Sequence, residues 1–333
     1  MPAGADSEKA SAIPGSGDPK RAGETKRAGD AKRAGETKRA GDPKRAGDPN
    51  RIVITGTAGL LGPDVARHFV ECGYHVVGVD RVPPKENICQ ENLLADLTDA
   101  GQVYSALSGA MGVVHLAALP RPGIYTSHVT FANNVVAAYN ILEAADNLGI
   151  KKAVVASSEC AYGFCFSRHH LRPVYFPVDE EHPALAEDCY GIGKIAAEKA
   201  AEGIHRRHGM QIISFRLGNV ITEPMYGHFK GWIHDPFKRV LNVWNYIDAR
   251  DIASACRLAI EKDGLGCDVM NLAADDNCMD IKSRDLIRAV FPDITDIRGE
   301  LAGYETLYSN AKAKKLLGWQ PAHSWRDHYC PAG

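Results

Sequence analysis

The stretch Arg51-Ile-Val-Ile-Thr-Gly56-Thr-Ala-Gly59-Leu-Leu-Gly62 decides the fold that this sequence predicts. Its first five residues form a short apolar run that predicts a buried strand, and a helical pattern follows the third glycine. Residues Tyr74–Asp80 predict a second buried strand, which ends in a carboxylate 18 residues beyond Gly62. A strand, a glycine turn, a helix, a second strand and an acid in this order predict a dinucleotide-binding unit.

The chemistry of a dinucleotide explains this spacing. Glycines let the backbone approach a pyrophosphate, which binds at the positive N-terminus of the following helix. At the end of the second strand, Asp80 is expected to accept hydrogen bonds from ribose hydroxyls. Its carboxylate repels a 2′-phosphate, so we expect NAD as the cofactor and disfavour NADP. The adjacent Arg81 weakens that preference.

Overall charge and composition exclude several classes of protein. The 333 residues hold 39 Lys and Arg against 41 Asp and Glu, and 45% of them are hydrophobic, which is ordinary for a soluble globular chain. This balance gives no reason to expect a nucleic acid or membrane partner, and no apolar run is long enough to span a bilayer. Nine cysteines without a CxxC pair, and the lack of a signal-peptide pattern, predict a reduced, cytoplasmic chain with no metal site.

The first 50 residues differ from the rest. From Arg21 they repeat every six residues, as RAGETK, RAGDAK, RAGETK, RAGDPK and RAGDPN, and carry a net charge of +3. They contain almost no large apolar side chains, so we predict a disordered N-terminal repeat tail over 1–50 and one folded domain over 51–333, with net charge −5. A solvated tail is the favoured interpretation, with a weak electrostatic tether as the alternative.

The glycine spacing is GxxGxxG, and from about Arg51 to Trp325 the chain resembles the extended short-chain dehydrogenase/reductase family. That family includes sugar-nucleotide epimerases, dehydratases and NAD-dependent dehydrogenases. The resemblance implies a Rossmann-type doubly wound parallel sheet with a small C-terminal α/β substrate lobe, mainly from 218–245 and 264–325. It also implies a homodimer formed through the helices around Phe131–Leu148 and Glu187–His208.

A pair of residues on a predicted helix carries the expected chemistry. Tyr190 and Lys194 lie four residues apart, hence on one helical face, where an ammonium favours a nearby phenolate for acid–base work. In the family that this chain resembles, such a pair acts with a serine at a strand end. Ser158 matches that position, and its neighbour Ser157 is the alternative. The implied reaction moves a proton through Tyr190 while hydride passes to the nicotinamide.

The resemblance also assigns positions to the cofactor. Asp96-Leu97 matches the pair that contacts adenine, and Leu116-Ala117-Ala118 matches the segment that passes under the cofactor. The complete set is Gly56, Gly59, Leu61, Gly62, Asp80, Arg81, Asp96, Leu97, Leu116, Ala117, Ala118, Asn134, Tyr190, Lys194, Leu217 and Asn219.

Two departures from the family pattern narrow the activity. Glu159-Cys160 stands where similar dehydratases carry two acids, which disfavours dehydration. Only about thirty residues separate Arg216-Leu-Gly-Asn219 from Asp248 and Asp251, so the space for a sugar nucleotide looks small. We therefore expect an NAD-dependent oxidoreductase that acts on a sugar-like or polyol alcohol. The two aspartates are expected to cap or stabilise the helix Ile252–Ile260.

The stretch from Arg216 to Pro224 resembles uronate dehydrogenases, but the arginine that grips the carboxylate there falls at His228. The candidate substrate residues are Arg121, Ser157, Glu159 and His228. Arg121 and the segment Arg168-His169-His170 are the candidates to bind a carboxylate in place of the missing arginine. Two alternatives stay open. One is an NAD-dependent sugar-nucleotide epimerase with tightly bound cofactor, and the other is a non-catalytic dinucleotide-binding regulatory protein.

Overall fold

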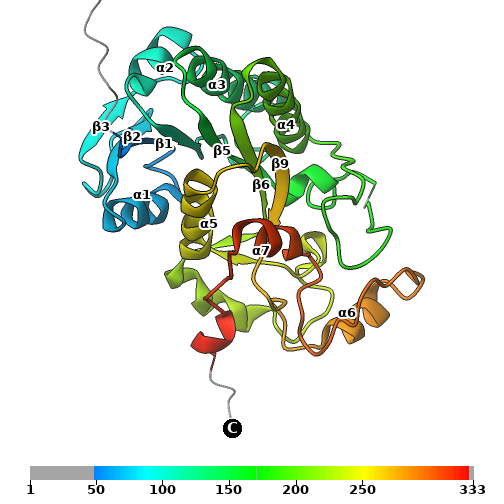
Figure 1. Cartoon of the computed structure of the whole chain (residues 1–333). Helices are drawn as coiled ribbons and strands as arrows, with labels where there is room; N and C mark the ends of the chain where they lie inside the picture. The colour runs from blue at the N-terminus through cyan, green and yellow to red at the C-terminus, as the bar shows by residue number, and fades with distance from the viewer. Residues whose placement is uncertain (1–48, 170, 330–333) are drawn as a thin grey trace, which may run out of the picture. The chain divides into compact units, whose positions relative to one another are not determined.

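A parallel β-sheet forms the centre of the computed structural model, which describes residues 49–169 and 171–329 (Figure 1). The sheet has seven strands in the order β3-β2-β1-β4-β5-β6-β9, and every neighbouring pair is parallel. The strands are β1 Arg51–Thr55, β2 His75–Asp80, β3 Glu91–Leu94, β4 Gly112–His115, β5 Lys152–Ser158, β6 Gln211–Leu217 and β9 Cys267–Leu272. The predicted doubly wound parallel sheet is confirmed.

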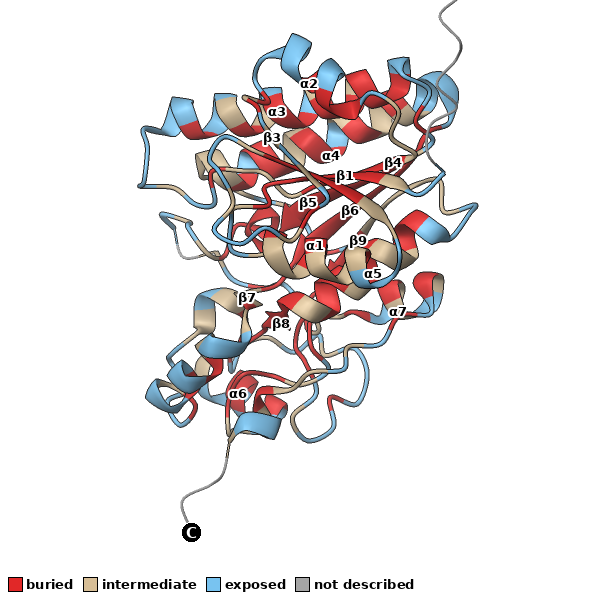
Figure 2. Ribbon diagram, turned by 90° about the vertical axis from the view of Figure 1, so that its left-hand side faces the viewer, coloured by how far each residue is buried: buried red, intermediate tan, exposed pale blue. Residues whose placement is uncertain are grey.

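Helices cover both faces of this sheet (Figures 1 and 2). On one face lie α1 Gly62–Glu71, α5 Ala249–Glu261 and α7 Ala311–Leu317. On the other lie α2 Ala100–Leu107, α3 Ser127–Asn147 and α4 Cys189–His208. Because both faces are covered, the inner strands β1, β4 and β5 are buried over almost their whole length.

Strand β1 shows how the sequence divides itself between the two faces. Ile52 and Ile54 belong to the apolar cluster under α1 and α5, whereas Val53 belongs to the cluster under α2, α3 and α4. Successive side chains of a strand point to opposite faces, so the alternation follows directly from the run Ile-Val-Ile. β1 pairs with β2 on one side and with β4 on the other. The strand order reverses between β1 and β4, and α/β sheets bind ligands at such a point, beyond the carboxyl ends of the strands.

A smaller lobe follows β6 and has its own apolar core. Its elements are β7 Val220–Ile221, η2 Glu223–Gly231, η3 Val240–Asn242, β8 Ile247–Asp248, α6 Ser283–Val290 and η4 Trp325–His328. Trp244 and Trp325 are fully buried in this core, and Phe176 and Val178 of the segment between η1 Glu159–Tyr162 and α4 join it. Within the range 264–325 that we expected for the lobe, Cys267–Leu272 forms an edge strand of the main sheet instead.

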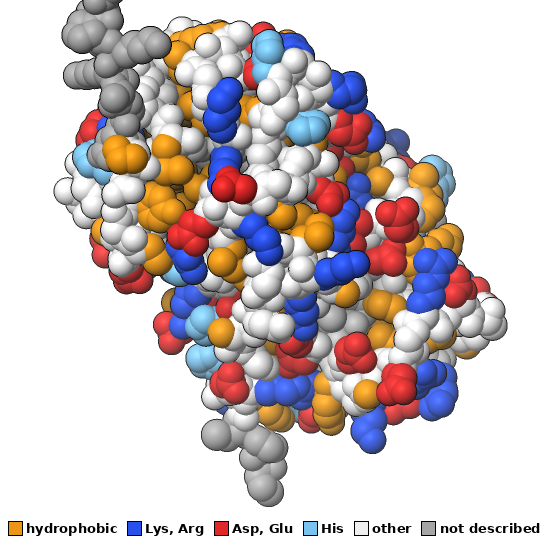
Figure 3. Space-filling model, viewed as in Figure 1, with side chains coloured by type: hydrophobic (Ala, Val, Ile, Leu, Met, Phe, Trp, Pro, Cys, Tyr) orange, Lys and Arg blue, Asp and Glu red, His pale blue; other side chains and the backbone are white. Residues whose placement is uncertain are grey.

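Charged side chains of both signs are interspersed on the face shown in Figure 3. The ion pairs of the smaller lobe include Arg298–Asp296 and Arg172–Asp293. Among the residues that the structure describes, no helix combines the length and the apolar character needed to cross a membrane.

The N-terminal tail predicted over 1–50 is described only at its end. The predicted disorder of 1–48 lies outside the described residues. Pro49 and Asn50 form an exposed turn directly before β1. The carbonyl oxygen of Asn50 accepts a hydrogen bond from the backbone N–H of His75 at 2.9 Å, so this turn leads into the first strand of the sheet beside β2.

Candidate active site

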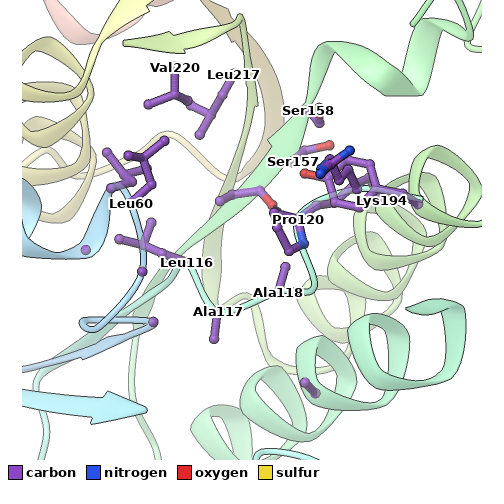
Figure 4. Close-up of a pocket in the computed structure, with 18 of the residues that line it drawn as sticks. Leu60, Leu116, Ala117, Ala118, Pro120, Ser157, Ser158, Lys194, Leu217 and Val220 are labelled. Carbon is purple, nitrogen blue, oxygen red and sulfur yellow. Dashed lines mark hydrogen bonds between the residues drawn. The ribbon is translucent and has the colours of Figure 1, made fainter. Parts of the chain in front are cut away.

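A cavity of about 690 Å³ opens at the carboxyl ends of β1, β4, β5 and β6. Figure 4 shows Leu60, Leu116, Leu217 and Val220 on one side of it and Ser157, Ser158 and Lys194 on the other. Most of the predicted site residues line this one cavity: Gly56, Gly59, Leu61, Gly62, Asp80, Arg81, Asp96, Leu97, Leu116, Ala117, Ala118, Arg121, Ser157, Ser158, Glu159, Tyr190, Lys194, Leu217 and Asn219.

The glycine turn packs too tightly for side chains. A Cβ on Gly62 would lie 2.1 Å from the carbonyl oxygen of Gly56, and Gly56 itself has φ +81°, a region that L side chains rarely adopt. The turn leads into α1, which begins at Gly62 and points its N-terminus at the cavity wall formed by the turn. This is the backbone shape and the helix polarity that a pyrophosphate requires.

Asp80 lies beside this turn at the end of β2. One carboxylate oxygen accepts a hydrogen bond from the backbone N–H of Ala58 at 3.0 Å, and the other accepts from the N–H of Arg81 at 2.7 Å. The second oxygen also accepts from the N–H of Val82 at 3.3 Å, whereas the oxygen bonded to Ala58 keeps a further lone pair for an incoming hydroxyl. Since Asp80 and the glycine turn line the same cavity, the residues present fit the ribose and pyrophosphate of a dinucleotide.

Asp96 and Asn134 differ in their relation to the cavity. Asp96 lines it and accepts hydrogen bonds from the backbone N–H and the hydroxyl of Thr98, which lower the pKa of the Asp96 carboxyl. Asn134 is buried and does not line it. Its amide donates to the carbonyl oxygen of Leu119 at 3.0 Å and accepts from the Leu119 N–H at 2.8 Å. Asn134 therefore fixes the loop after β4.

Tyr190 and Lys194 lie in the first turns of α4. The side chain of Asp188 caps this helix by accepting hydrogen bonds from the N–H groups of Tyr190 and Gly191. The Lys194 ammonium donates to the carbonyl oxygen of Ala156 at 2.6 Å. Burial lowers the pKa of Lys194 to about 8 and raises that of Tyr190, which a hydrogen bond to Ser158 opposes. The ammonium is thus held where it can stabilise a phenolate.

The two neighbouring serines have different partners. The Ser157 hydroxyl bonds to the Glu198 carboxylate at 2.6 Å, so its proton is already donated. The Ser158 oxygen accepts from the backbone N–H of Cys160 as the N-cap of η1. Its own proton is not needed for that bond. Ser158 therefore has a donor available at the cavity, whereas Ser157 supports the wall behind it.

The sequence did not predict the ion pair behind Ser157. Glu198 accepts two hydrogen bonds from the Arg216 guanidinium, at 3.0 and 2.8 Å, and both side chains are buried. The guanidinium also lies over the ring of Tyr162, 4.8 Å from its centroid. Glu198 follows Lys194 by one helical turn, so the spacing along α4 was the available signal.

Glu159 is a second buried carboxyl at the cavity wall, with two amides that the sequence did not predict. Asn242 and Asn245 each donate to one of its oxygens at 2.5 Å. Burial raises the pKa of Glu159 to about 7, and these hydrogen bonds oppose the rise. The amides come from a strained segment, in which Arg239, Val243 and Trp244 have φ of 61°, 44° and 56°.

Other candidate substrate residues lie apart from these groups. His228 is exposed on η2 and is not part of the cavity lining. Arg121 is exposed and lines the cavity. Arg168 is also exposed, and the ring of His169 bonds to Glu187 at 2.8 Å. His170 lies outside the described residues.

Comparisons with known proteins agree with this geometry. The model of the NAD dependent epimerase/dehydratase family matches residues 52–273. An NAD-dependent glucose-6-phosphate dehydrogenase of Haloferax volcanii is 28% identical over 180 residues, which are 51% of this chain and 68% of that protein. A uronate dehydrogenase of Pseudomonas putida is 28% identical over 52% of this chain and 62% of its own length. A UDP-glucose 4-epimerase of Corynebacterium glutamicum is 25% identical over 82% and 92%.

Solved structures show the same fold. A UDP-galactose 4-epimerase superposes with a TM-score of 0.58 at 28% identity, covering 82% of this chain and 94% of that one. MoeE5 in complex with UDP-glucose and NAD has a TM-score of 0.60 at 21% identity, over 83% and 95%. The residues that the family model matches run from β1 to the segment just after β9. The resemblance predicted from the sequence is confirmed, and the chain belongs to the NAD-dependent epimerase/dehydratase family.

Proposed function

We propose that this chain is an NAD-dependent dehydrogenase of a free sugar or polyol. One observation carries the proposal: Ser158, Tyr190 and Lys194 line the same cavity as the glycine turn and Asp80. An acid–base pair and a dinucleotide site therefore meet in one space. A regulatory protein that only senses a dinucleotide has no use for a half-buried tyrosine and a buried lysine arranged in this way.

Three side chains would share the transfer of the substrate proton. Ser158 donates a hydrogen bond to the reacting oxygen of the substrate and orients it toward Tyr190. Tyr190 takes the proton of the substrate hydroxyl, and the Lys194 ammonium, fixed by the Ala156 carbonyl, stabilises the phenolate. The nicotinamide, when bound, supplies the hydride acceptor. The Glu198–Arg216 pair holds Ser157 and so keeps this wall of the cavity in place.

We propose NAD as the preferred cofactor over NADP. Asp80 presents a carboxylate at the end of β2, fixed by the Ala58 N–H, and a 2′-phosphate at that position would meet like charge. Arg81 lines the cavity next to it and would favour a phosphate. The kcat/KM values for the two cofactors test the preference.

An epimerase is the second candidate, and one observation favours it. The alignment with the Corynebacterium UDP-glucose 4-epimerase covers 82% of this chain, more than the alignments with the dehydrogenases named above. In an epimerase the hydride returns to the sugar, so no net NADH forms. The short segment between Asn219 and Asp248 favours the dehydrogenase, because it leaves little chain to bind a nucleotide diphosphate.

A substrate panel separates the two. Free sugars, uronates, polyols, UDP-sugars and dTDP-sugars are incubated with NAD, and absorbance at the NADH band is followed while products are separated by chromatography. Net NADH with a free sugar or polyol supports the dehydrogenase. Interconversion of sugar nucleotides without NADH supports the epimerase and contradicts our proposal. The Tyr190→Phe variant is the control in both arms.

We also propose that the chain is a homodimer through α3 and α4. Both helices expose apolar side chains: Val129, Phe131, Val136 and Tyr139 on α3 and Ile192 on α4. The two helices pack against one another, so these side chains lie on adjoining elements of one layer (Figure 2). Light scattering after size exclusion should give twice the chain mass, and Phe131→Glu with Val136→Glu should give the monomer.

A further inference from the structure

The carboxyl group of Glu159 is an unusual feature of the cavity wall. The residue is 7% exposed, and it follows Ser158 directly, so it lies at the substrate end of the cavity. The amides of Asn242 and Asn245 donate to its two oxygens, and the Cys165 thiol also interacts with it, so its direct partners are neutral groups. Within the part of the chain that the structure describes, Glu159 forms no ion pair. A buried carboxyl with this environment is costly to ionise and needs further donors.

The two amides are themselves fixed, so they hold the carboxyl at a defined place. Asn245 is fully buried, and its oxygen accepts from the backbone N–H of Asn219 at 3.2 Å. Its amide also donates to the carbonyl oxygen of Asn242 at 2.5 Å. A Cβ on Gly218 would lie 2.0 Å from the Asn245 oxygen, so only glycine leaves room for this contact. The arrangement is built into the chain at three separate segments.

When it is ionised, the carboxyl group of Glu159 can only accept further hydrogen bonds. A carboxylate offers about four acceptor sites, and the two amides occupy one on each oxygen. A substrate hydroxyl fills a free site by donating its proton. A substrate carboxylate or phosphate brings further acceptors and a second negative charge, which is unfavourable next to a buried carboxylate.

The neighbouring charges do not cancel this effect. Arg239 is the cation that lowers the pKa of Glu159, but its guanidinium lies over the ring of Trp232 and it is not part of the cavity lining. The Lys194 ammonium is held by the carbonyl oxygen of Ala156. Cys165 and Tyr308 also interact with Glu159, and neither is a cation.

We propose that Glu159 determines the substrate class, by accepting a hydrogen bond from a second hydroxyl of a neutral sugar or polyol and disfavouring substrates with a carboxylate or phosphate at that position. The proposal rests on the proposed dehydrogenase function. It assigns the reacting hydroxyl to Ser158 and Tyr190 and a second hydroxyl of the same molecule to Glu159, the first residue of η1. Specificity and acid–base chemistry are then carried by adjacent residues.

The test compares matched pairs of substrates that differ in one group. Galactose with galacturonate and glucose with glucuronate differ at the terminal carbon, and glucose 6-phosphate adds a phosphate there. NADH formation gives kcat/KM for each with the wild type, with Glu159→Gln and with Asp96→Asn. Asp96 is the matched control, because it is a carboxylate in the same cavity at the expected cofactor end.

We expect the wild type to favour the neutral member of each pair. Glu159→Gln should shift the ratio of kcat/KM toward the anionic member by about tenfold or more, because it removes the charge and keeps the shape. Asp96→Asn should change the KM for NAD and leave the ratio unchanged. A wild type that uses both members of the pairs equally, or a Glu159→Gln variant with an unchanged ratio, overturns the role of Glu159 and leaves the dehydrogenase standing.

A second measurement needs no variant and covers the case in which Glu159→Gln does not fold. The ratio of kcat/KM for galacturonate to that for galactose is followed with the wild type from about pH 6 to about 8.5, a range that brackets the titration of a carboxyl with pKa about 7. It should fall as pH rises through about 7, because Glu159 gains its charge there. Titration of Tyr190 and Lys194 affects both substrates and cancels in the ratio. A kcat/KM ratio that does not change with pH contradicts the proposal. If no substrate of the panel gives NADH, both the proposal and the dehydrogenase function are overturned.

Discussion

The Lys194 ammonium lies 5.4 Å from the centroid of the Tyr190 ring, one helical turn along α4. The ammonium also donates a hydrogen bond to the carbonyl oxygen of Ala156 on β5. Its position is therefore set by the sheet as well as by the helix. The charge stays beside the phenol even though burial lowers the pKa of Lys194 to about 8.

Removing the phenolic hydroxyl of Tyr190 should slow turnover strongly and leave the fold intact. Tyr190→Phe removes the group that takes the substrate proton, so kcat should fall by about 10² to 10⁴. The affinity for NAD, measured by titration calorimetry, should change little, because the ring remains. A variant with wild-type kcat on the best substrate of the panel contradicts the role of Tyr190.

The Asp80→Asn variant should bind NAD more weakly and discriminate less against NADP. The carboxylate is the expected partner of the ribose hydroxyls, so its loss should raise the KM for NAD and shift the kcat/KM ratio toward NADP by about tenfold or more. Asp96→Asn serves as the control, because it neutralises another carboxylate of the same cavity. Equal ratios for both variants would show that Asp80 does not discriminate.

The buried pair of Glu198 and Arg216 should stabilise the protein strongly. Glu198→Ala leaves the guanidinium buried without its partner and should lower the free energy of unfolding by about 3–5 kcal/mol. The matched control is Glu202→Ala on the same helix, whose ion pair with Lys199 is exposed and should contribute less than about 1 kcal/mol. Urea unfolding monitored by circular dichroism measures both, and similar losses would contradict the argument.

His115 should make the protein less stable in acid. It is buried at the end of β4, its ring bonds to the Thr55 hydroxyl at 2.8 Å, and burial lowers its pKa from 6.5 to about 3. The unfolded chain therefore binds a proton below about pH 6.5 that the folded chain does not bind until about pH 3. This proton uptake favours unfolding as pH falls through that window.

The wild type should accordingly lose stability relative to His115→Gln by up to ~1.4 kcal/mol per pH unit below about pH 6.5. Urea midpoints measured at about pH 7, 6, 5 and 4, which span this window, give the difference. His128→Gln, at an exposed histidine on α3, is the control and should follow the wild type at every pH. A constant difference between wild type and His115→Gln would show that His115 does not titrate on unfolding.

The features that could be predicted from the sequence are those that local patterns determine. The glycine turn, Asp80 and the pair Tyr190 and Lys194 lie within single strand–helix units, so their spacing alone indicates their geometry. The same holds for Asp248, which caps α5 as expected by accepting from the Arg250 N–H. These features depend on a few neighbouring residues.

Contacts between residues far apart in the sequence could not be predicted from such local patterns. Glu159 is bonded to amides 83 and 86 residues away, and only the path of the smaller lobe brings them together. Asp251 lies in the first turn of α5, and it also accepts from the N–H groups of Ala322 and His323 near the C-terminus, which the sequence did not predict. Acceptors of this kind have many potential donors, and the tertiary fold selects among them.

The three apolar clusters have a consequence for how this enzyme family can diversify. The glycine turn and the Tyr190–Lys194 pair are carried by the two clusters around the main sheet, whereas Asn242 lies on η3 between Val240 and Val243, which pack in the third. Sequence change in the third cluster can therefore alter which molecule is accepted while the redox machinery stays as it is. For directed evolution, libraries of variants confined to residues 239–245 would change the substrate specificity and keep the cofactor-binding and acid–base residues unchanged.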